Sequence, residues 1–193
     1  MQDFLCYLKI GWEHIISLDA VDHQLFVLVL VAVYTYYDWR KILVLVTAFT
    51  IGHSITLALS VLDIFRIPGN LVEFLIPLTI LITAADNILM RNKHSSLIKL
   101  NYYLALFFGL IHGMGFANSA RLMLAKEQNI LVPLAGFNLG LELGQVVVVL
   151  IILMFEILVI KFFKLKKLHW IVFSSAITFL IALKVCLERL PFF

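Results

Sequence analysis

Long apolar runs separated by short polar stretches make up most of the chain. A helix needs about 20 apolar residues to cross the ~30 Å of hydrocarbon in a bilayer, and six runs are close to that length. We predict spans at residues 20–37, 42–62, 70–90, 98–118, 131–160 and 169–188. Turn and charge signals such as DIFRIPGN at 63–70 separate them. The pattern therefore predicts an all-α fold, a polytopic membrane helix bundle that forms a single domain over residues 1–193.

The N-terminal segment, residues 1–18, follows a different pattern, because it is too short and too charged to cross a bilayer. Leu8, Trp12 and Ile15 recur on one helical face, and Lys9 lies away from it. An apolar face beside a charged one is typical of a helix that lies in the membrane interface. We therefore expect an interfacial helix over this segment, before the first span.

Composition indicates a membrane protein and argues against a nucleic-acid partner. Hydrophobic residues make up 63% of the chain, charged residues make up 14%, and the mean hydropathy is +1.04. A soluble domain of this size could not bury so much apolar surface. The net charge of +3 is small and is spread between apolar segments. The lipid bilayer is therefore the expected environment, and the spacing of Cys6 and Cys186 indicates neither a metal site nor a redox site.

The distribution of lysine and arginine predicts the orientation in the membrane. The loops after the first, third and fifth predicted spans hold nine of these residues, and the opposite side holds six. Cytoplasmic loops carry the excess of positive charge. Both termini are therefore expected on the periplasmic side of a bacterial inner membrane.

A group of polar residues stands where the first apolar run begins. His14, Asp19, Asp22 and His23 bring imidazole and carboxylate groups together at this point. Such groups are costly in lipid unless they are paired, hydrated or bound to a metal. We therefore predict that this stretch is one part of a polar site within the membrane.

Other predicted spans place polar side chains at a similar depth. Asn138, Glu142 and Gln145 occur at i, i+4 and i+7, so they share one face of a helix. A helix rises about 1.5 Å per residue, which gives the depth of each residue within its predicted span. On this scale, polar residues from five helices converge on the outer half of the bilayer. These residues are His23, His53, Ser54, Glu73, His112, Asn138, Glu142 and Gln145.

The donor chemistry of this set favours a metal ion. Neutral imidazole suits nickel, zinc, copper and iron, and carboxylates orient the histidines that bind them. The candidate metal ligands are His14, Asp19, Asp22, His23, His53, His112 and Glu142. Ser54, Glu73, Asn138 and Gln145 are candidate supporting polar residues. Hydrogen bonding between helices is an equally good account of Asn138 and Gln145.

Four sequence blocks resemble a known family. They are HIISLDAVDHQLF (14–26), TAFTIGHSITL (47–57), FGLIHGMGFA (108–117) and FNLGLELGQ (137–145). They are similar to the second branch of the HupE/UreJ family of membrane proteins. The resemblance implies a polytopic protein related to the accessory permeases of hydrogenase and urease gene clusters, which are thought to pass nickel. It also implies that the metal-handling residues are His14, Asp22, His23, His53, His112 and Glu142.

Two functional hypotheses follow. The first is a membrane permease for a divalent transition-metal ion, nickel or cobalt, in which no residue is catalytic. The alternative is an intramembrane zinc-dependent hydrolase acting on a lipid or acyl substrate, with Glu142 or Asp22 as general base beside zinc-bound water. Assembly as a homo-oligomer or as a subunit of a membrane complex is left open by the sequence.

Overall fold

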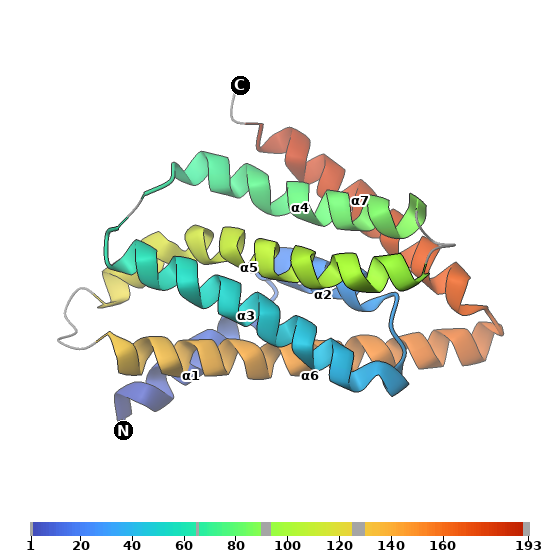
Figure 1. Ribbon diagram of the computed structural model, residues 1–193, viewed down its shortest axis with the longest axis horizontal. Helices are drawn as coiled ribbons and strands as arrows, with labels where there is room; N and C mark the ends of the chain where they lie inside the picture. The colour runs from blue at the N-terminus through green and yellow to red at the C-terminus, as the bar shows by residue number, and fades with distance from the viewer. Residues whose placement is uncertain (1, 65, 90–93, 125–129, 191–193) are drawn as a thin grey trace.

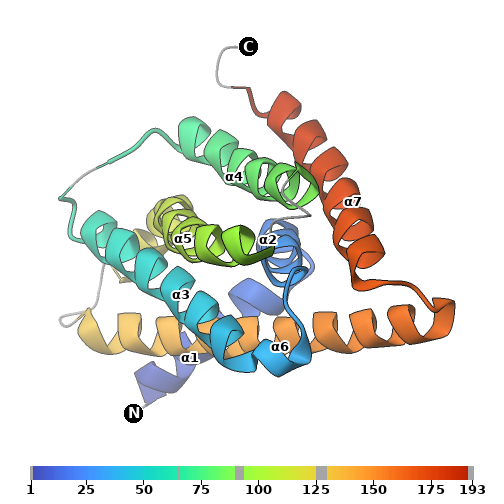
Figure 2. The ribbon, with the colours of Figure 1, turned by 45° about the vertical axis from the view of Figure 1, so that its right-hand side comes forward.

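The computed structural model describes residues 2–64, 66–89, 94–124 and 130–190, which form seven α-helices and one short 3₁₀ helix (Figure 1). In chain order these are α1 (Gln2–Ile16), α2 (Val21–Val31), η1 (Tyr36–Asp38), α3 (Trp39–Val61), α4 (Gly69–Leu89), α5 (His94–Leu124), α6 (Leu131–Phe163) and α7 (Lys167–Glu188). No strand occurs within those ranges, so the expected all-α fold is confirmed. Figure 2 shows α2 and α5 lying between the α4–α7 pair and α6.

Four helices in the described ranges are long and apolar enough to cross a membrane. They are α3 with the preceding turn (Tyr36–Val61), α4, α6 and α7. The pair α1–α2 passes the same test when its two halves are counted as one span. The chain is therefore an integral membrane protein with four or five candidate spans, and the predicted count of six is not confirmed.

The predicted first span, residues 20–37, is only partly helical. Its helix α2 has 11 residues, which is about 16 Å at about 1.5 Å per residue and too short to cross a bilayer alone. Helix α1 precedes it across a break at which the chain bends by 70°. The side-chain amide of Gln24 donates to the carbonyls of Ile15 (3.3 Å) and Ser17 (3.0 Å). These bonds pair backbone groups at the break, as an apolar environment requires.

Helix α1 packs along the first half of α6 with backbone touching backbone. A Cβ added to Gly140 would lie 2.0 Å from the carbonyl oxygen of Leu8, and one added to Gly11 would lie 2.0 Å from that of Phe137. Small residues allow such close approach of helices in membranes. This contact places α1 in the bundle, and the predicted interfacial position of residues 1–18 is not confirmed.

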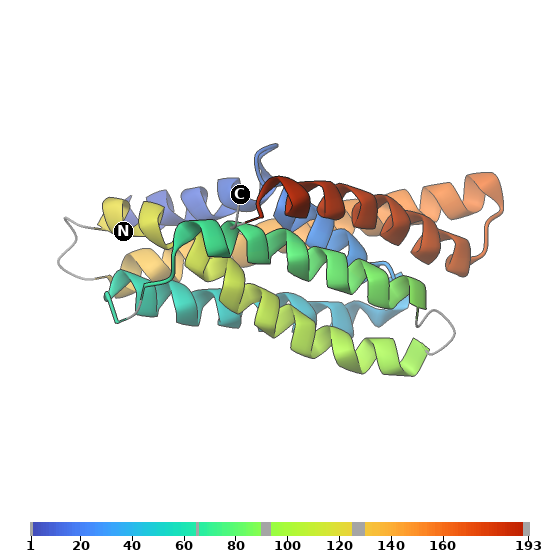
Figure 3. The ribbon, with the colours of Figure 1, turned by 90° about the horizontal axis from the view of Figure 1, so that it is seen from above.

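Helices α3 and α5 form a second tight pair. A Cβ on Gly109 would lie 2.1 Å from the carbonyl oxygen of Phe49, and one on Gly113 would lie 2.4 Å from that of His53. The two helices run side by side in the views of Figures 1 and 3. Because the glycines remove the side chains between the two backbones, they bring His53 of α3 close to α5.

Replacing Gly109 with alanine is expected to destabilise the protein by about 2–3 kcal/mol, since overpacking a core costs about 1–3 kcal/mol and neither backbone can yield here. The free energy of unfolding, measured by denaturant titration in mixed micelles, checks this. Gly69→Ala is the matched control, because a Cβ at Gly69 has no neighbour within 4 Å. Equal stability of the two variants would mean that α3 and α5 are not in backbone contact.

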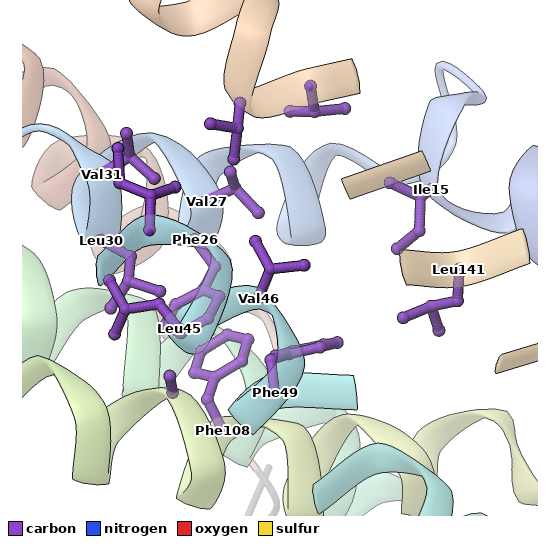
Figure 4. Close-up of a cluster of buried hydrophobic side chains, with 14 of the residues drawn as sticks. Ile15, Phe26, Val27, Leu30, Val31, Leu45, Val46, Phe49, Phe108 and Leu141 are labelled. Carbon is purple, nitrogen blue, oxygen red and sulfur yellow. The ribbon is translucent and has the colours of Figure 1, made fainter. Parts of the chain in front are cut away.

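Stacked aromatic rings of the hydrophobic core lie between α2, α3 and α5. Phe26 stacks on Phe108 with ring centroids 3.5 Å apart, and Phe49 lies 5.8 Å from Phe26. Figure 4 shows these rings surrounded by aliphatic side chains, Leu30 and Leu45 among them. Phe49 and Phe108 each lie four residues before a histidine on the same helix, so the core directly adjoins the polar groups.

A buried ion pair joins the other end of the bundle. Glu156 of α6 is only 5% exposed, and its carboxylate accepts a hydrogen bond from the ammonium group of Lys167 at the start of α7. The same ammonium group donates to the carbonyl oxygen of Tyr34, which follows α2. One lysine therefore connects three segments of the chain.

Candidate metal centre

Four helices each contribute one histidine to a single cluster. His14 lies in the last turn of α1, His23 in the first turn of α2, His53 within α3 and His112 within α5. The ring centroids of His23 and His112 are 4.2 Å apart, those of His14 and His23 are 4.8 Å apart, and those of His14 and His53 are 6.2 Å apart. The structure thus brings the four predicted histidines into one continuous group.

Asp22 adds a carboxylate to this cluster. Its Oδ1 lies 2.9 Å from Nδ1 of His23, and its Oδ2 lies 3.7 Å from Nε2 of His112. One ligand atom from each of Asp22, His23 and His112 fits within 4.8 Å of the others. Asp22 also lies in the first turn of α2, where the helix dipole favours a negative charge. These three residues are the best-placed ligand group in the described part of the chain.

Most of the ring nitrogens in the cluster are buried without a hydrogen-bond partner among the described residues. They are Nε2 of His14, Nε2 of His23, and both nitrogens of His53 and His112. Buried polar atoms in folded proteins nearly always have a partner. Buried ring nitrogens without a hydrogen-bond partner are available to a bound cation, and the residues present therefore fit a metal ion.

Phenylalanines enclose the histidines, a feature that the sequence reasoning missed. Phe108 lies 4.2 Å from His112 between ring centroids, and Phe116 lies 4.5 Å from His14. Phe137 lies 5.8 Å from His53. A detectable signal was the repeated Phe-x-x-x-His spacing in FTIGH and FGLIH, which places the two rings on one helical face. The apolar surroundings strengthen electrostatic attraction inside the cluster.

The predicted residues of α6 serve different contacts. Glu142 accepts a hydrogen bond from the Thr47 hydroxyl at 2.7 Å, and Gln145 accepts one from Thr50 at 3.2 Å. Glu142 is outside the group of close ligand atoms, although its helix adjoins the cluster. Asn138 lies near His53, and Asn138 Oδ1 is buried without a hydrogen-bond partner in the described ranges.

Three further predicted residues make other contacts or are exposed. Ser54 donates to the carbonyl oxygen of Thr50 at 2.6 Å, which is a bond within α3. Asp19 is exposed in the break between α1 and α2 and lines a cavity together with Asp22. Glu73 is exposed on α4. None of the three belongs to the group of close ligand atoms in the described part of the chain.

Comparison with known families supplies the identity of the chain. The profile of the HupE / UreJ protein family matches residues 1–189. The chain belongs to the HupE/UreJ family. The resemblance seen in the four sequence blocks is thereby confirmed over nearly the whole length. Comparisons with curated proteins and with solved structures gave no match.

In this HupE/UreJ protein the arrangement is suited to holding a divalent cation. Two imidazole nitrogens and one carboxylate oxygen can bind one ion, and the rings of His14 and His53 continue the row of donors away from it. Nitrogen and oxygen donors without a thiolate suit nickel, cobalt, zinc and iron. The cluster can therefore accept a transition-metal ion and offer it more than one set of ligands.

Proposed function

We propose that this HupE/UreJ protein is a membrane permease whose substrate is a divalent transition-metal ion, nickel or cobalt. The observation that carries the proposal is the cluster of four histidines and Asp22 between membrane helices, with most ring nitrogens unpartnered within the described ranges. The association of the family with nickel and cobalt transport supports the same conclusion. A cargo site must bind the ion and also let it leave.

The donor set is consistent with reversible binding. Imidazole and carboxylate ligands hold nickel and cobalt less firmly than a set of cysteine thiolates would hold soft metals. Successive ring centroids are 4.2, 4.8 and 6.2 Å apart, so an ion can exchange one donor for the next. Transfer between neighbouring donors lowers the barrier that release from one rigid site would impose.

We further propose that both termini face the periplasm of a bacterial inner membrane, as the lysine and arginine distribution indicates. The six apolar runs then form six spans, and α1 and α2 make up the first of them across their 70° break. Inward movement of a dication is driven by the membrane potential, which is worth ~2.3 kcal/mol per charge per 100 mV.

Uptake of ⁶³Ni²⁺ into proteoliposomes tests the permease. Vesicles that contain the wild-type protein are expected to accumulate nickel under an inside-negative potential, whereas protein-free vesicles and vesicles with His23→Ala are not. Collapse of the potential with an ionophore should slow the wild-type rate. Equal uptake by the His23→Ala and wild-type proteins would refute a role for the cluster in transport.

A zinc-dependent hydrolase is the second candidate, because a group of three ligand atoms leaves a position free for water. Tight retention of the ion distinguishes this candidate from a permease. Elemental analysis after dialysis against a weak chelator should find near-stoichiometric zinc in a hydrolase and little metal in a permease. In that reaction Asp22 would belong to the ligand group, and the other predicted general base, Glu142, accepts a hydrogen bond from Thr47.

A further inference from the structure

A cavity of about 140 Å³ lies between α2, α4 and α7 beside the metal cluster. Its walls are mainly aliphatic, with Pro77 of α4 and Ala182 of α7 among them. Asp19, Asp22 and Arg189 supply its charged groups. One water molecule requires about 10–15 Å³ of such space, so the cavity can hold several waters or a partly hydrated ion.

Asp22 connects this cavity to the histidines. Its side chain is 34% exposed, whereas the side chains of His23 and His112 are 6% and 1% exposed. The carboxylate lines the cavity and also lies 3.7 Å from Nε2 of His112, a buried nitrogen without a hydrogen-bond partner among the described residues. An ion in the cavity that reaches Asp22 is therefore one ligand exchange away from the histidines.

A proline in α4 fixes the charged rim of the cavity. Pro77 has no N–H group, so the carbonyl oxygen of Glu73, four residues earlier, lacks its helical partner. The Arg189 guanidinium donates to that oxygen at 3.4 Å. Arg189 thereby ties the end of α7 to α4. Two carboxylates in the cavity outweigh this single positive charge and leave the cavity attractive to a dication.

We infer that this cavity is the entrance through which the hydrated divalent ion reaches the cluster. Asp19, at the exposed edge of the break, attracts the ion. The Asp22 carboxylate is then the first protein ligand to replace one of the ion's water molecules. His112 and His23 then replace further waters. The inference rests on the proposed function for the identity of the cargo and adds the route and the residue that captures the ion.

Filling the cavity tests the route. In Ala182→Trp, the indole is expected to slow Co²⁺ association with the detergent-solubilised full-length protein at least about tenfold by displacing the waters of the cavity. Stopped-flow absorbance of the Co²⁺ complex gives the rate, and an equilibrium titration should give the wild-type amplitude. Leu180→Trp is the control, because Leu180 is exposed on the same helix and does not line the cavity. A wild-type association rate in Ala182→Trp overturns the inference.

Asp19→Asn supplies a test that does not depend on accommodating a large side chain. Loss of one charge near the approaching dication should raise KM for Co²⁺ uptake about three- to tenfold at low salt, with the maximal rate unchanged. Glu13→Gln is the control, since Glu13 is an exposed acid on α1 away from the cavity. Unchanged KM in Asp19→Asn contradicts the capture role. If wild-type vesicles import no ion, the permease proposal fails, while the Co²⁺ association rates still decide whether the cavity is the entrance.

Discussion

Replacing His112 with alanine is expected to weaken Co²⁺ binding at least about 100-fold and to stop measurable uptake. His112 is buried, and its imidazole is one of the three donors whose ligand atoms lie within 4.8 Å of one another. Even residues that only support a metal ligand are worth about 10–100-fold in affinity, and loss of a direct ligand should exceed this. Titration of the purified protein followed by Co²⁺ absorbance measures the affinity, and proteoliposomes measure uptake.

The chain offers two informative comparisons for this result. His169→Ala is the control, because His169 is exposed at the start of α7 and contacts the backbone N–H of Lys166. It should leave Co²⁺ affinity and uptake unchanged. His53→Ala should cause a smaller loss than His112→Ala, since His53 lies outside the group of three close ligand atoms. Co²⁺ affinity that is equal in His112→Ala and in the wild type would rule out the assigned site.

Replacing Lys167 with methionine is expected to lower the free energy of unfolding by about 3–5 kcal/mol, the usual cost of removing one partner of a buried ion pair. Glu156 would be left buried without its counter-charge, and the carbonyl oxygen of Tyr34 would lose the Lys167 donor. Denaturant titration in mixed micelles measures the loss. Co²⁺ affinity of the folded fraction should stay at the wild-type value, because this pair lies at the opposite end of α2 from the cluster.

The double variant Glu156→Gln with Lys167→Met separates the charge from the packing. Removing the unpaired carboxylate should restore about half or more of the lost stability, because an amide costs far less to bury than an unpaired charge. Lys161→Met is the control for loss of a lysine, since Lys161 is exposed on the same end of α6. A double variant as unstable as Lys167→Met would show that the buried charge is not the cause.

Hydropathy was sufficient to predict most helices and the polar residues inside them. Residues 42–62 and 70–90, for example, correspond to α3 and α4. Hydropathy could not predict the break in the first span, because the polar residues around Asp19 also suit the end of an interfacial helix. The sequence also could not predict that α1 packs on α6. Gly140 permits close packing, but the sequence does not indicate which helix packs against it.

The residue types of the candidate site were predictable from the sequence, and the contacts between these residues were less so. Asn138 and Glu142 are one turn apart on α6, and helical periodicity assigns them to one face. A face is broad, however, and α6 contacts both α1 and α3 along it. Asn138 therefore lies near His53, while Glu142 accepts a hydrogen bond from Thr47. The rotation of a helix against its neighbours depends on tertiary packing, which periodicity alone does not contain.

The break between α1 and α2 divides the donor set between two rigid segments. His14 is on one side of the 70° bend, and Asp22 and His23 are on the other. Any change in the bend changes the separation of the His14 and His23 rings, which is 4.8 Å in this conformation. An ion that contacts both sides must prefer one bend angle, and the free energy by which the bend alters ion affinity equals the free energy by which the ion biases the bend. Occupancy of the cluster and the shape of the first span are therefore thermodynamically linked variables.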